Sequence, residues 1–548
     1  MHWQGRTRFT IFDSGYGDGA RFTAVLQAWR ADPQGPRHLH YIALASSPLP
    51  GFRRVPQDDP DVTLDLLHAP LDLALAQLDA RLDAIDLHAI NDQGAGFARA
   101  LARLSAPGAT LRATGLTDAQ ARALGGAGFD CSSIENGAIS AVFTTRKPAS
   151  PWARKAEATR RAIVLGAGLA GSAACERLCA RGWDVTLVER HPAPAGEASG
   201  NLAGIYMPLL SQDDNIMTRL SRAAFLYALA YWDKLGGFGP DAMTGAQCGV
   251  LQLARDAGHA QVQAQIARVH RYPFHYAQWL DPAEALAWSG LAAPHGGWLF
   301  PQAGWARPAS VCDAMLAACG DRLERRFGVG QVSLARHGAL WSVTGEGGAV
   351  LASAPVVIVA NGAASLELAQ TASLPLASVR GQVTHLAAGE APALPFVLCR
   401  EAYLTPAMSG LHSLGASYDD DQDRTLRAAS QHQNLEKIRS MLGAPGLGAH
   451  APLAGRVGFR CVAPDRLPLV GALPDAQRAG PTERLREIAR QSGLYGLLGY
   501  ASRGLIWAPL AAELLASQLD GDPLPLEADL ATALDPARFL LRARRRAV

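Results

Sequence analysis

The chain has 548 residues, of which 49% are hydrophobic and 18% are charged, and its formal net charge is +2. This length predicts two or three globular domains, and the composition excludes a disordered chain. No uninterrupted apolar run is long enough to cross a bilayer, and the first residues lack the pattern of a secretory signal, so we expect a cytoplasmic protein with no membrane partner.

The chain opens with a Rossmann-like pattern. In "RFTIFDSGYGDGARFTAVLQAW" a strand, a glycine turn and a helix follow one another, with Gly15, Gly17 and Gly19 in the turn, and "LHYIALASSPL" supplies a second strand. That strand ends at Ala45, so it lacks the carboxylate that would hold a ribose diol. We predict a separate first domain over residues 1–148.

A polar, basic segment then predicts a linker over residues 149–161. The stretch "TTRKPASPWARKAEATRR" is interrupted by two prolines, and "LRARRRAV" near the C-terminus is basic as well. Such segments are usually solvated and flexible, but together they would suit a polyanionic partner. The basic residues before the next strand are Arg146, Lys147, Arg154, Lys155, Arg160 and Arg161.

The strongest motif follows, in "RAIVLGAGLAGSAACERLCARGWDVTLVER". A short apolar strand over 162–165 leads into Gly166, Gly168 and Gly171 and then into a helix over 172–181. Gly166 permits the tight turn, Gly168 lets backbone approach a pyrophosphate, and Gly171 lets helix and strand pack closely. The N-terminus of the helix offers N–H groups to phosphates. This pattern predicts a dinucleotide site.

The second strand of this unit, over 184–188, ends at Glu189, about 20 residues past the glycines. A carboxylate there accepts hydrogen bonds from an adenosine ribose and argues against a ribose 2′-phosphate.

Segments later in the chain are also predicted to contribute to the nucleotide-binding sheet and its ligand site. The small-residue loop "ASGNLAGIYMPLL" could lie against a flat ring, "APVVIVANGA" reads as a buried parallel strand, and a glycine turn over 499–504 precedes a helix from Ala508. One dinucleotide site built from such distant segments is typical of a flavoprotein, so FAD is the predicted cofactor. The predicted FAD-binding residues are Gly166, Gly168, Gly171, Glu189, Arg190, Ser199, Gly200, Asn201, Gly204, Asn361, Gly362, Gly499, Arg503 and Gly504.

The eight cysteines include no CxxC pair, and no His cluster has zinc-like spacing. We therefore expect buried free thiols, with no metal site. They are Cys131, Cys175, Cys179, Cys248, Cys312, Cys319, Cys399 and Cys461.

A family resemblance adds to these patterns. "GGWLFPQAGWARPASVC", "LASVRGQVTHL", "CREAYLTPA", "LGASYDDD" and "GRVGFRCVAPDRLPLVGALPD", in this order, resemble the flavin half of the bifunctional enzymes of tRNA 5-methylaminomethyl-2-thiouridine biosynthesis, within the wider D-amino-acid-oxidase-like family. The first domain resembles the methyltransferase half of the same enzymes. The expected α/β fold is thus a truncated, Rossmann-like methyltransferase-type domain, followed over 162–548 by a glutathione-reductase/D-amino-acid-oxidase-like FAD domain with an inserted α+β substrate region, roughly 236–330 and 372–455.

The resemblance implies a reaction on the anticodon stem-loop of tRNA. The flavin half of the family removes the carboxymethyl group from 5-carboxymethylaminomethyl-2-thiouridine at the wobble position, and the methyltransferase half then methylates the amine with S-adenosylmethionine. The resemblance also implies that Arg460 binds the substrate carboxylate, because the planar guanidinium of an arginine can bind both oxygens. Tyr403 would donate a hydrogen bond to the same carboxylate. Arg380 and Arg307 are further candidates to line the site, and an ion pair with Asp465 is the alternative role for Arg460.

The first domain departs from its family where the methyl-transfer chemistry would lie. Ala45 replaces an acidic residue, Asn91 stands where an Asp-Gly-Phe motif is expected, and Asp18 brings a negative charge into the glycine turn. We therefore predict a degenerate domain in which S-adenosylmethionine binding and methylation are lost. The alternatives are a fully bifunctional enzyme, a small-molecule amine or glycine oxidase, and a non-catalytic tRNA-binding flavoprotein. The sequence leaves the oligomeric state open.

Overall fold

The computed structural model describes residues 3–88, 96–135, 138–144, 156–157, 159–448, 453–478 and 484–546. The chain divides into two compact units. The first comprises Met1–Ala158 and Glu513–Thr532, and the second comprises Thr159–Ala512 and Ala533–Val548. Most of the predicted linker, including Arg154 and Lys155, lies outside the described residues, and so do Arg146 and Lys147 just before it.

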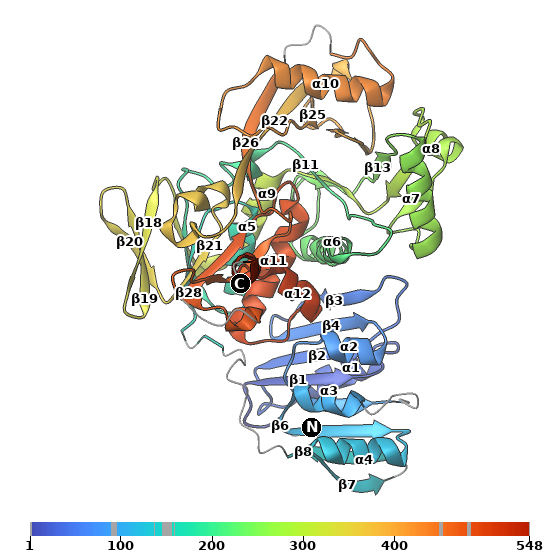
Figure 1. Cartoon of the computed structure of the whole chain (residues 1–548), viewed down its shortest axis with the longest axis vertical. Coiled ribbons are helices and arrows are strands. Elements are labelled where there is room, and N and C mark those ends of the chain that lie inside the picture. The colour runs from blue at the N-terminus through green and yellow to red at the C-terminus, as the bar shows by residue number, and fades with distance from the viewer. Residues whose placement is uncertain are drawn as a thin grey trace. The chain divides into compact units, whose positions relative to one another are not determined.

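An eight-stranded sheet forms the first unit (Figure 1), in the order β3-β4-β2-β1-β5-β6-β8-β7. The strands from β4 to β6 in this order pair in parallel, whereas β3, β8 and β7 are antiparallel to their neighbours. This arrangement is the Rossmann-like fold predicted for residues 1–148. The elements are β1 (Arg8–Asp13), α1 (Ala20–Ala31), β2 (His38–Leu44), β3 (Gly51–Val55), β4 (Val62–His68), α2 (Leu71–Gln77), β5 (Leu82–Leu87), α3 (Gly96–Leu104), β6 (Ser105–Thr114), α4 (Asp118–Ala127), β7 (Phe129–Glu135) and β8 (Ala138–Phe143).

Both faces of this sheet are buried, which explains the nearly continuous apolar run in β1. Successive residues point to opposite faces. Ile11 packs into a core with Leu39 and Phe22 on one side, whereas Phe12 packs with Leu101 on the other. The local pattern of the sequence was therefore sufficient to predict the start of this unit, the strand, glycine turn, helix and second strand.

The segment Glu513–Thr532 packs with the first unit, although the sequence division placed it within residues 162–548. Arg54, which is 5% exposed, explains this difference. Its guanidinium donates to Glu513 Oε1 at 2.7 Å, to Ser517 Oγ at 2.8 Å and to Asp65 Oδ2 at 2.8 Å. A buried charge requires such partners, and two of them, Glu513 and Ser517, lie more than 450 residues away in the chain, beyond the reach of local patterns.

The nucleotide-binding sheet of the second unit has six strands, in the order β17-β10-β9-β21-β28-β27. All of them pair in parallel except β27, which runs antiparallel to β28. A three-stranded sheet, β18-β19-β20, follows β17 in the chain. The elements are β9 (Arg161–Leu165), α5 (Leu169–Ala180), β10 (Asp184–Val188), β17 (Leu323–Arg326), β18 (Val332–His337), β19 (Leu340–Gly345), β20 (Val350–Ala354), β21 (Val356–Val359), β27 (Leu469–Pro474), β28 (Arg490–Leu498) and α11 (Gly504–Asp520).

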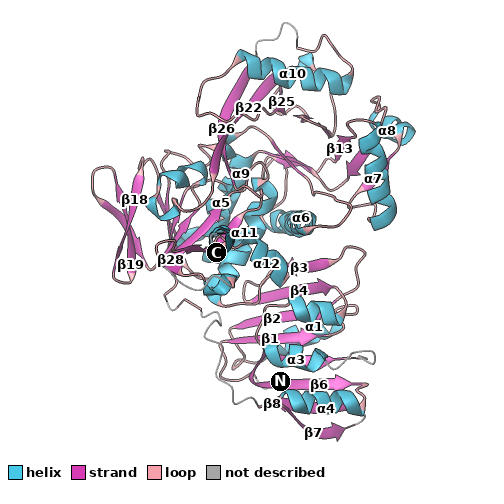
Figure 2. Ribbon diagram, in the orientation of Figure 1, coloured by secondary structure: helices cyan, strands magenta, loops and turns pink. Residues whose placement is uncertain are grey.

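A second, eight-stranded sheet of the same unit has the order β14-β15-β13-β23-β24-β25-β22-β26, of which Figure 2 labels β13, β22, β25 and β26. Strands β11, β16 and β12 form a small separate sheet. The remaining elements are β11 (Gly204–Tyr206), α6 (Ile216–Lys234), β12 (Gly245–Ala246), β13 (Val250–Leu253), α7 (Ala257–His270), β14 (Gln278–Leu280), α8 (Pro282–Ser289), β15 (Gly297–Phe300), β16 (Gly304–Ala306), α9 (Pro308–Ala317), β22 (Ala377–Ala387), β23 (Val397–Cys399), β24 (Tyr403–Leu404), β25 (Leu411–Gly415), α10 (Ala428–Leu442), β26 (Ala454–Val462), α12 (Ala528–Leu534) and α13 (Arg538–Arg546).

Two helix starts differ from the sequence expectation. Helix α5 begins at Leu169 and α11 begins at Gly504, three and four residues earlier than expected. In both cases the glycine turn runs directly into the first helical turn. Among the described residues, no helix is long and apolar enough to span a membrane. The eight cysteines are free thiols, six of them buried, whereas Cys131 is exposed because it lies on the edge strand β7.

Candidate active site

The glycine turn between β9 and α5 has no room for side chains. Gly166 has a φ of +98°, and a Cβ there would lie 2.7 Å from the Cα of Asn361, beyond the end of β21. A Cβ on Gly171 would lie 1.8 Å from the carbonyl oxygen of Gly166. The backbone is therefore packed as closely as the dinucleotide motif requires.

Glu189, directly after β10, is 7% exposed and faces this turn. Its Oε2 accepts a hydrogen bond from Ala167 N at 2.7 Å, and its Oε1 accepts one from His191 N at 2.9 Å. Each oxygen of an ionised carboxylate can accept a second hydrogen bond. The backbone thus orients Glu189 while leaving it able to accept from two hydroxyl groups.

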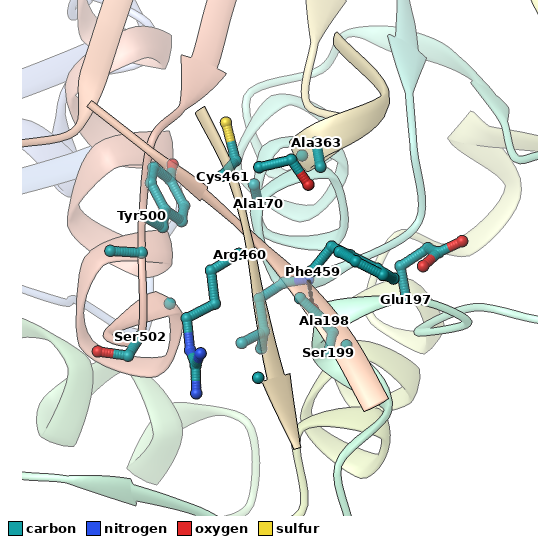
Figure 3. A pocket seen from close by; sticks show the side chains of 18 of the residues that line it. Ala170, Glu197, Ala198, Ser199, Ala363, Phe459, Arg460, Cys461, Tyr500 and Ser502 are labelled. Carbon is teal, nitrogen blue, oxygen red and sulfur yellow. Dashed lines mark hydrogen bonds between the residues drawn. The ribbon is translucent and has the colours of Figure 1, made fainter. Parts of the chain in front are cut away.

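A cavity of about 920 Å³ extends from this turn across the second unit (Figure 3). It is large enough for an extended ligand of drug size or above. Its lining brings together segments from β9 to the start of α11, as the flavoprotein pattern predicted. The predicted cofactor residues that line it are Gly166, Gly168, Glu189, Arg190, Ser199, Asn201, Gly204, Asn361, Gly362, Gly499, Arg503 and Gly504.

Two predicted residues, Gly171 and Gly200, do not line the cavity, and each has a packing role instead. Gly171 seats α5 on the turn. Gly200 leaves room for Arg456, because a Cβ there would lie 2.2 Å from its guanidinium.

Arg456 was not among the predicted site residues. It donates to the backbone oxygens of Gly196, Glu197 and Gly200 at 2.6–2.9 Å, and so holds the loop whose Ser199 lines the cavity. Figure 3 shows Ser199 close to Phe459, three residues after Arg456 on β26. The only sequence signal was that Arg456 falls in the same segment as Arg460.

Polar groups on the cavity wall lack partners among the described residues. The Oδ1 of Asn361 and the hydroxyl of Tyr500 are buried without a hydrogen bond. Unsatisfied buried polar atoms are costly, and a ligand bound in the cavity would supply the missing partners of these two. Together with the glycine turn and Glu189, these atoms fit a dinucleotide such as FAD.

Arg460, on β26, lines the cavity where Figure 3 shows it near Tyr500 and Ser502. Its Nη1 donates to the carbonyl oxygens of Ser417 at 3.2 Å and Arg380 at 3.4 Å, and burial lowers the pKa of the guanidinium. Among the described residues it has no carboxylate partner, because Asp465 pairs instead with Arg538 at 2.9 Å. The alternative of an Arg460–Asp465 ion pair is therefore wrong.

Tyr403, on β24, lines the same cavity. Burial raises the pKa of its phenol to about 12, against the opposing effect of Arg460. The hydroxyl is therefore protonated at neutral pH and can donate a hydrogen bond. A neutral donor beside an arginine can bind an anion.

Arg380 and Arg307 do not line the cavity, which corrects their prediction as site residues. Arg380 is fully buried and donates to Asp419 Oδ2 at 2.9 Å and to the carbonyls of Asp423 and Thr425 at 2.7 Å. Its guanidinium is thus bonded within the protein and does not reach the cavity. Arg307 precedes α9 with an exposed side chain.

In the first unit, an arginine side chain from α1 lies across the glycine turn that follows β1. Arg21 donates to Asp13 Oδ1 at 3.1 Å and to the Gly15 carbonyl at 3.2 Å, while Tyr41 donates to Asp13 Oδ2 at 2.6 Å. Ala45, after β2, offers only backbone groups, and its carbonyl bonds to His68 at 2.9 Å. Asn91 lies outside the described residues.

Comparisons with known proteins agree with this geometry. A family described as "FAD dependent oxidoreductase" (DAO) matches residues 161–518. Glycine oxidase from Geobacillus kaustophilus is 21% identical with a TM-score of 0.58 over 69% of this chain and 99% of its own, and iminodiacetate oxidase from Chelativorans is 22% identical with a TM-score of 0.55 over 66% and 96%. These two show the fold alone.

A curated relative from Burkholderia thailandensis, the tRNA 5-methylaminomethyl-2-thiouridine biosynthesis bifunctional protein MnmC, is 41% identical over 99% of this chain and 92% of its own length. A relative with the same name from Azoarcus is also 41% identical, over the same shares of the two chains. The chain therefore belongs to the MnmC family, and its second unit carries an FAD-dependent oxidoreductase domain that uses FAD.

Proposed function

We propose that the second unit removes the carboxymethyl group from 5-carboxymethylaminomethyl-2-thiouridine at the wobble position of tRNA, leaving the 5-aminomethyl base. The relatives' name supplies the substrate class. The observation that carries the reaction is one continuous cavity that joins the dinucleotide-binding turn to Arg460 and Tyr403. Cofactor and carboxylate-binding groups thus share one space.

Arg460 is the proposed anchor for the substrate carboxylate. Its guanidinium faces the cavity without a carboxylate partner among the described residues, and its fork can bind both oxygens of a CH₂–COO⁻ group. Tyr403 donates a further hydrogen bond to the same group. Fixing the carboxylate fixes the adjacent methylene carbon, which is the atom to be oxidised.

When bound, FAD would supply the two-electron oxidation of this methylene carbon. The residues proposed to hold it are those of the glycine turn, Glu189 on the adenosine ribose, and the loop at Ser199 and Asn201. The substrate amine must be neutral for the carbon to release a hydride, and the cationic Arg460 disfavours a second positive charge nearby. Water then adds to the resulting C=N bond, and glyoxylate leaves from the amine.

Anaerobic mixing of the yellow holoenzyme with tRNA that carries the modified base tests this function. We expect the flavin absorbance to bleach, and nucleoside analysis to show 5-aminomethyl-2-thiouridine. A small-molecule amine oxidase, the main alternative, would bleach with glycine or sarcosine and not with tRNA. A non-catalytic RNA-binding flavoprotein would bleach with neither.

We further propose that the first unit no longer methylates. Arg21 and Tyr41 both donate hydrogen bonds to the buried carboxylate of Asp13 at the end of β1. Ala45 has no side-chain acceptor for a ribose. The alignment with the Burkholderia thailandensis relative also runs over 604 positions, although this chain has 548 residues. The relative therefore carries residues that this chain lacks.

A further inference from the structure

Cationic residues are concentrated in two segments of the second unit. Residues 463–490 and 533–546 together hold ten arginines and five acidic residues, in a chain whose cationic and acidic residues number 51 and 49. The exposed arginines of these segments are called the arginine surface below. They are Arg466, Arg478, Arg484, Arg486, Arg542, Arg545 and Arg546.

The structure packs these two segments together into one element. Ile488 shares an apolar core with Ala537 and Leu541 of α13. Arg544 Nη2 donates to the Arg478 carbonyl at 2.8 Å, and the buried Arg538 donates to the Leu467 carbonyl at 2.9 Å. The two segments that carry the exposed arginines are therefore held against each other.

The acidic residues of the same segments are used to hold this element together. Asp465 pairs with Arg538 at 2.9 Å and with Arg542 at 3.3 Å, and Asp535 pairs with Arg490 at 2.7 Å. By contrast, among the described residues Arg478, Arg484 and Arg486 make no ion pair. Asp465 and Asp535 thus pair with the arginines that anchor α13, and Arg542 of the arginine surface shares Asp465, whereas Arg478, Arg484 and Arg486 have no carboxylate partner among the described residues.

The chemistry of this surface suits phosphate groups. Each arginine guanidinium can bind two oxygens of one phosphate group. Several arginines on one packed surface therefore suit a polymer with regularly spaced phosphates. The ring of Phe539 is covered by Arg538 and Arg542, whose guanidinium carbons lie 4.3 and 5.6 Å from its centre, so it is not available for base stacking. Such a surface positions a nucleic acid without reading its bases.

The arginine surface begins a few residues along the chain from the cavity wall. Arg466 follows Arg460 by six residues, which places the two Cα atoms no more than about 22 Å apart. Building on the proposed function, we propose that the arginine surface binds the phosphate backbone of the tRNA whose wobble base enters the cavity. It supplies affinity that is independent of the modification state of the RNA.

The test compares the full-length holoenzyme with the triple variant Arg478→Gln/Arg484→Gln/Arg486→Gln. Binding of a fluorescent, unmodified tRNA transcript is measured by anisotropy from about 50 to 300 mM salt. Loss of three phosphate contacts should lower the slope of log affinity against log salt by about 2 to 3, and should weaken binding roughly 30- to 100-fold near 0.15 M salt. The matched control is Arg255→Gln/Arg268→Gln/Arg336→Gln, which removes three exposed arginines, one just before α7, one on α7 and one on β18, and should leave both quantities unchanged.

Equal affinity and slope in the triple variant and the control would overturn the proposal, and so would loss of binding to anionic phosphatidylserine vesicles without loss of tRNA binding. Flavin bleaching separates this inference from the proposed function. With modified tRNA the triple variant should keep kcat and raise KM. The wild-type holoenzyme could bind tRNA through these arginines while its flavin absorbance never bleaches. That result would support the arginine surface as the tRNA-binding site and refute the proposed reaction.

Discussion

The guanidinium carbon of Arg460 lies 5.4 Å from the centre of the Tyr418 ring, within cation–π distance, and both residues line the cavity. Tyr418 is 56% exposed, so it forms an accessible wall beside the arginine. The ring and the carbonyl of Ser417 hold the guanidinium in one orientation. A residue so held can bind a carboxylate in a fixed pose.

Arg460→Lys should therefore retain FAD and lose most of the demodification activity. A lysine supplies charge without the planar fork, and loss of one charge-assisted hydrogen bond costs about 1.5–3 kcal/mol, or about ten- to a hundredfold in rate. Flavin absorbance measures cofactor content, and nucleoside analysis of the tRNA measures activity. Near-normal kinetics would remove Arg460 from the carboxylate site.

Gly381→Ala is a second substitution that tests the position of the Arg460 guanidinium. Gly381 on β22 lies against the arginine, and a Cβ there would lie 2.1 Å from Arg460 Nη1. The added methyl group should displace the guanidinium and reduce the flavin-reduction rate as Arg460→Lys does, with FAD retained. Gly389→Ala, where a Cβ meets nothing within 4 Å, is the matched control. Full activity in Gly381→Ala would show that the position of the guanidinium is unimportant.

The strand pattern alone could not distinguish Arg460 from Arg380. Both lie in strands of one antiparallel pair, where Arg380 pairs with Phe459, and a shift of one residue turns a side chain to the opposite face. Only the position of the loop at Asp419 and Asp423 shows that Arg380 is enclosed. The dinucleotide turn, by contrast, was predictable, because its glycines, helix and Glu189 lie within 30 consecutive residues.

Gly168→Val should expel FAD. Gly168 lines the cavity, and a Cβ there would already lie 3.0 Å from Ser199 Oγ, which accepts a hydrogen bond from Leu169 N at 3.1 Å. The larger side chain therefore fills the space through which the backbone approaches the pyrophosphate and displaces the loop. The purified variant should be colourless but folded by circular dichroism, whereas Gly347→Ala, at an open position, should stay yellow. Stoichiometric FAD in Gly168→Val would contradict the assignment of this turn.

Tyr403→Phe should lower activity without changing the alkaline side of the pH profile. The pKa of Tyr403 is raised to about 12 by burial, so the phenol is protonated throughout the range below about pH 11, and its hydrogen bond is lost only above that range. The expected loss is a few-fold to about tenfold in kcat/KM, the value of one hydrogen bond. An alkaline decline near pH 9 that disappears in the variant would show that Tyr403 titrates there and would refute this role.

The chain should not methylate tRNA at a useful rate. In the first unit Asp13 is fully buried and already receives hydrogen bonds from Arg21, Tyr41 and the Gly15 N–H, while Ala45 gives no carboxylate to a ribose. One missing hydrogen bond costs only about 1–3 kcal/mol, which an enzyme can tolerate, but several deficits at one site are not tolerated together.

Incubation with labelled S-adenosylmethionine and tRNA bearing 5-aminomethyl-2-thiouridine gives the measurement, and we expect no label on the base. Ala45→Glu alone should not restore transfer, because Arg21 would still cross the glycine turn. The double variant Ala45→Glu/Arg21→Ala separates the two causes: cofactor binding by calorimetry should reappear only when the arginine is also removed. Robust labelling by the unaltered protein would establish both activities in this chain and overturn the loss of methylation.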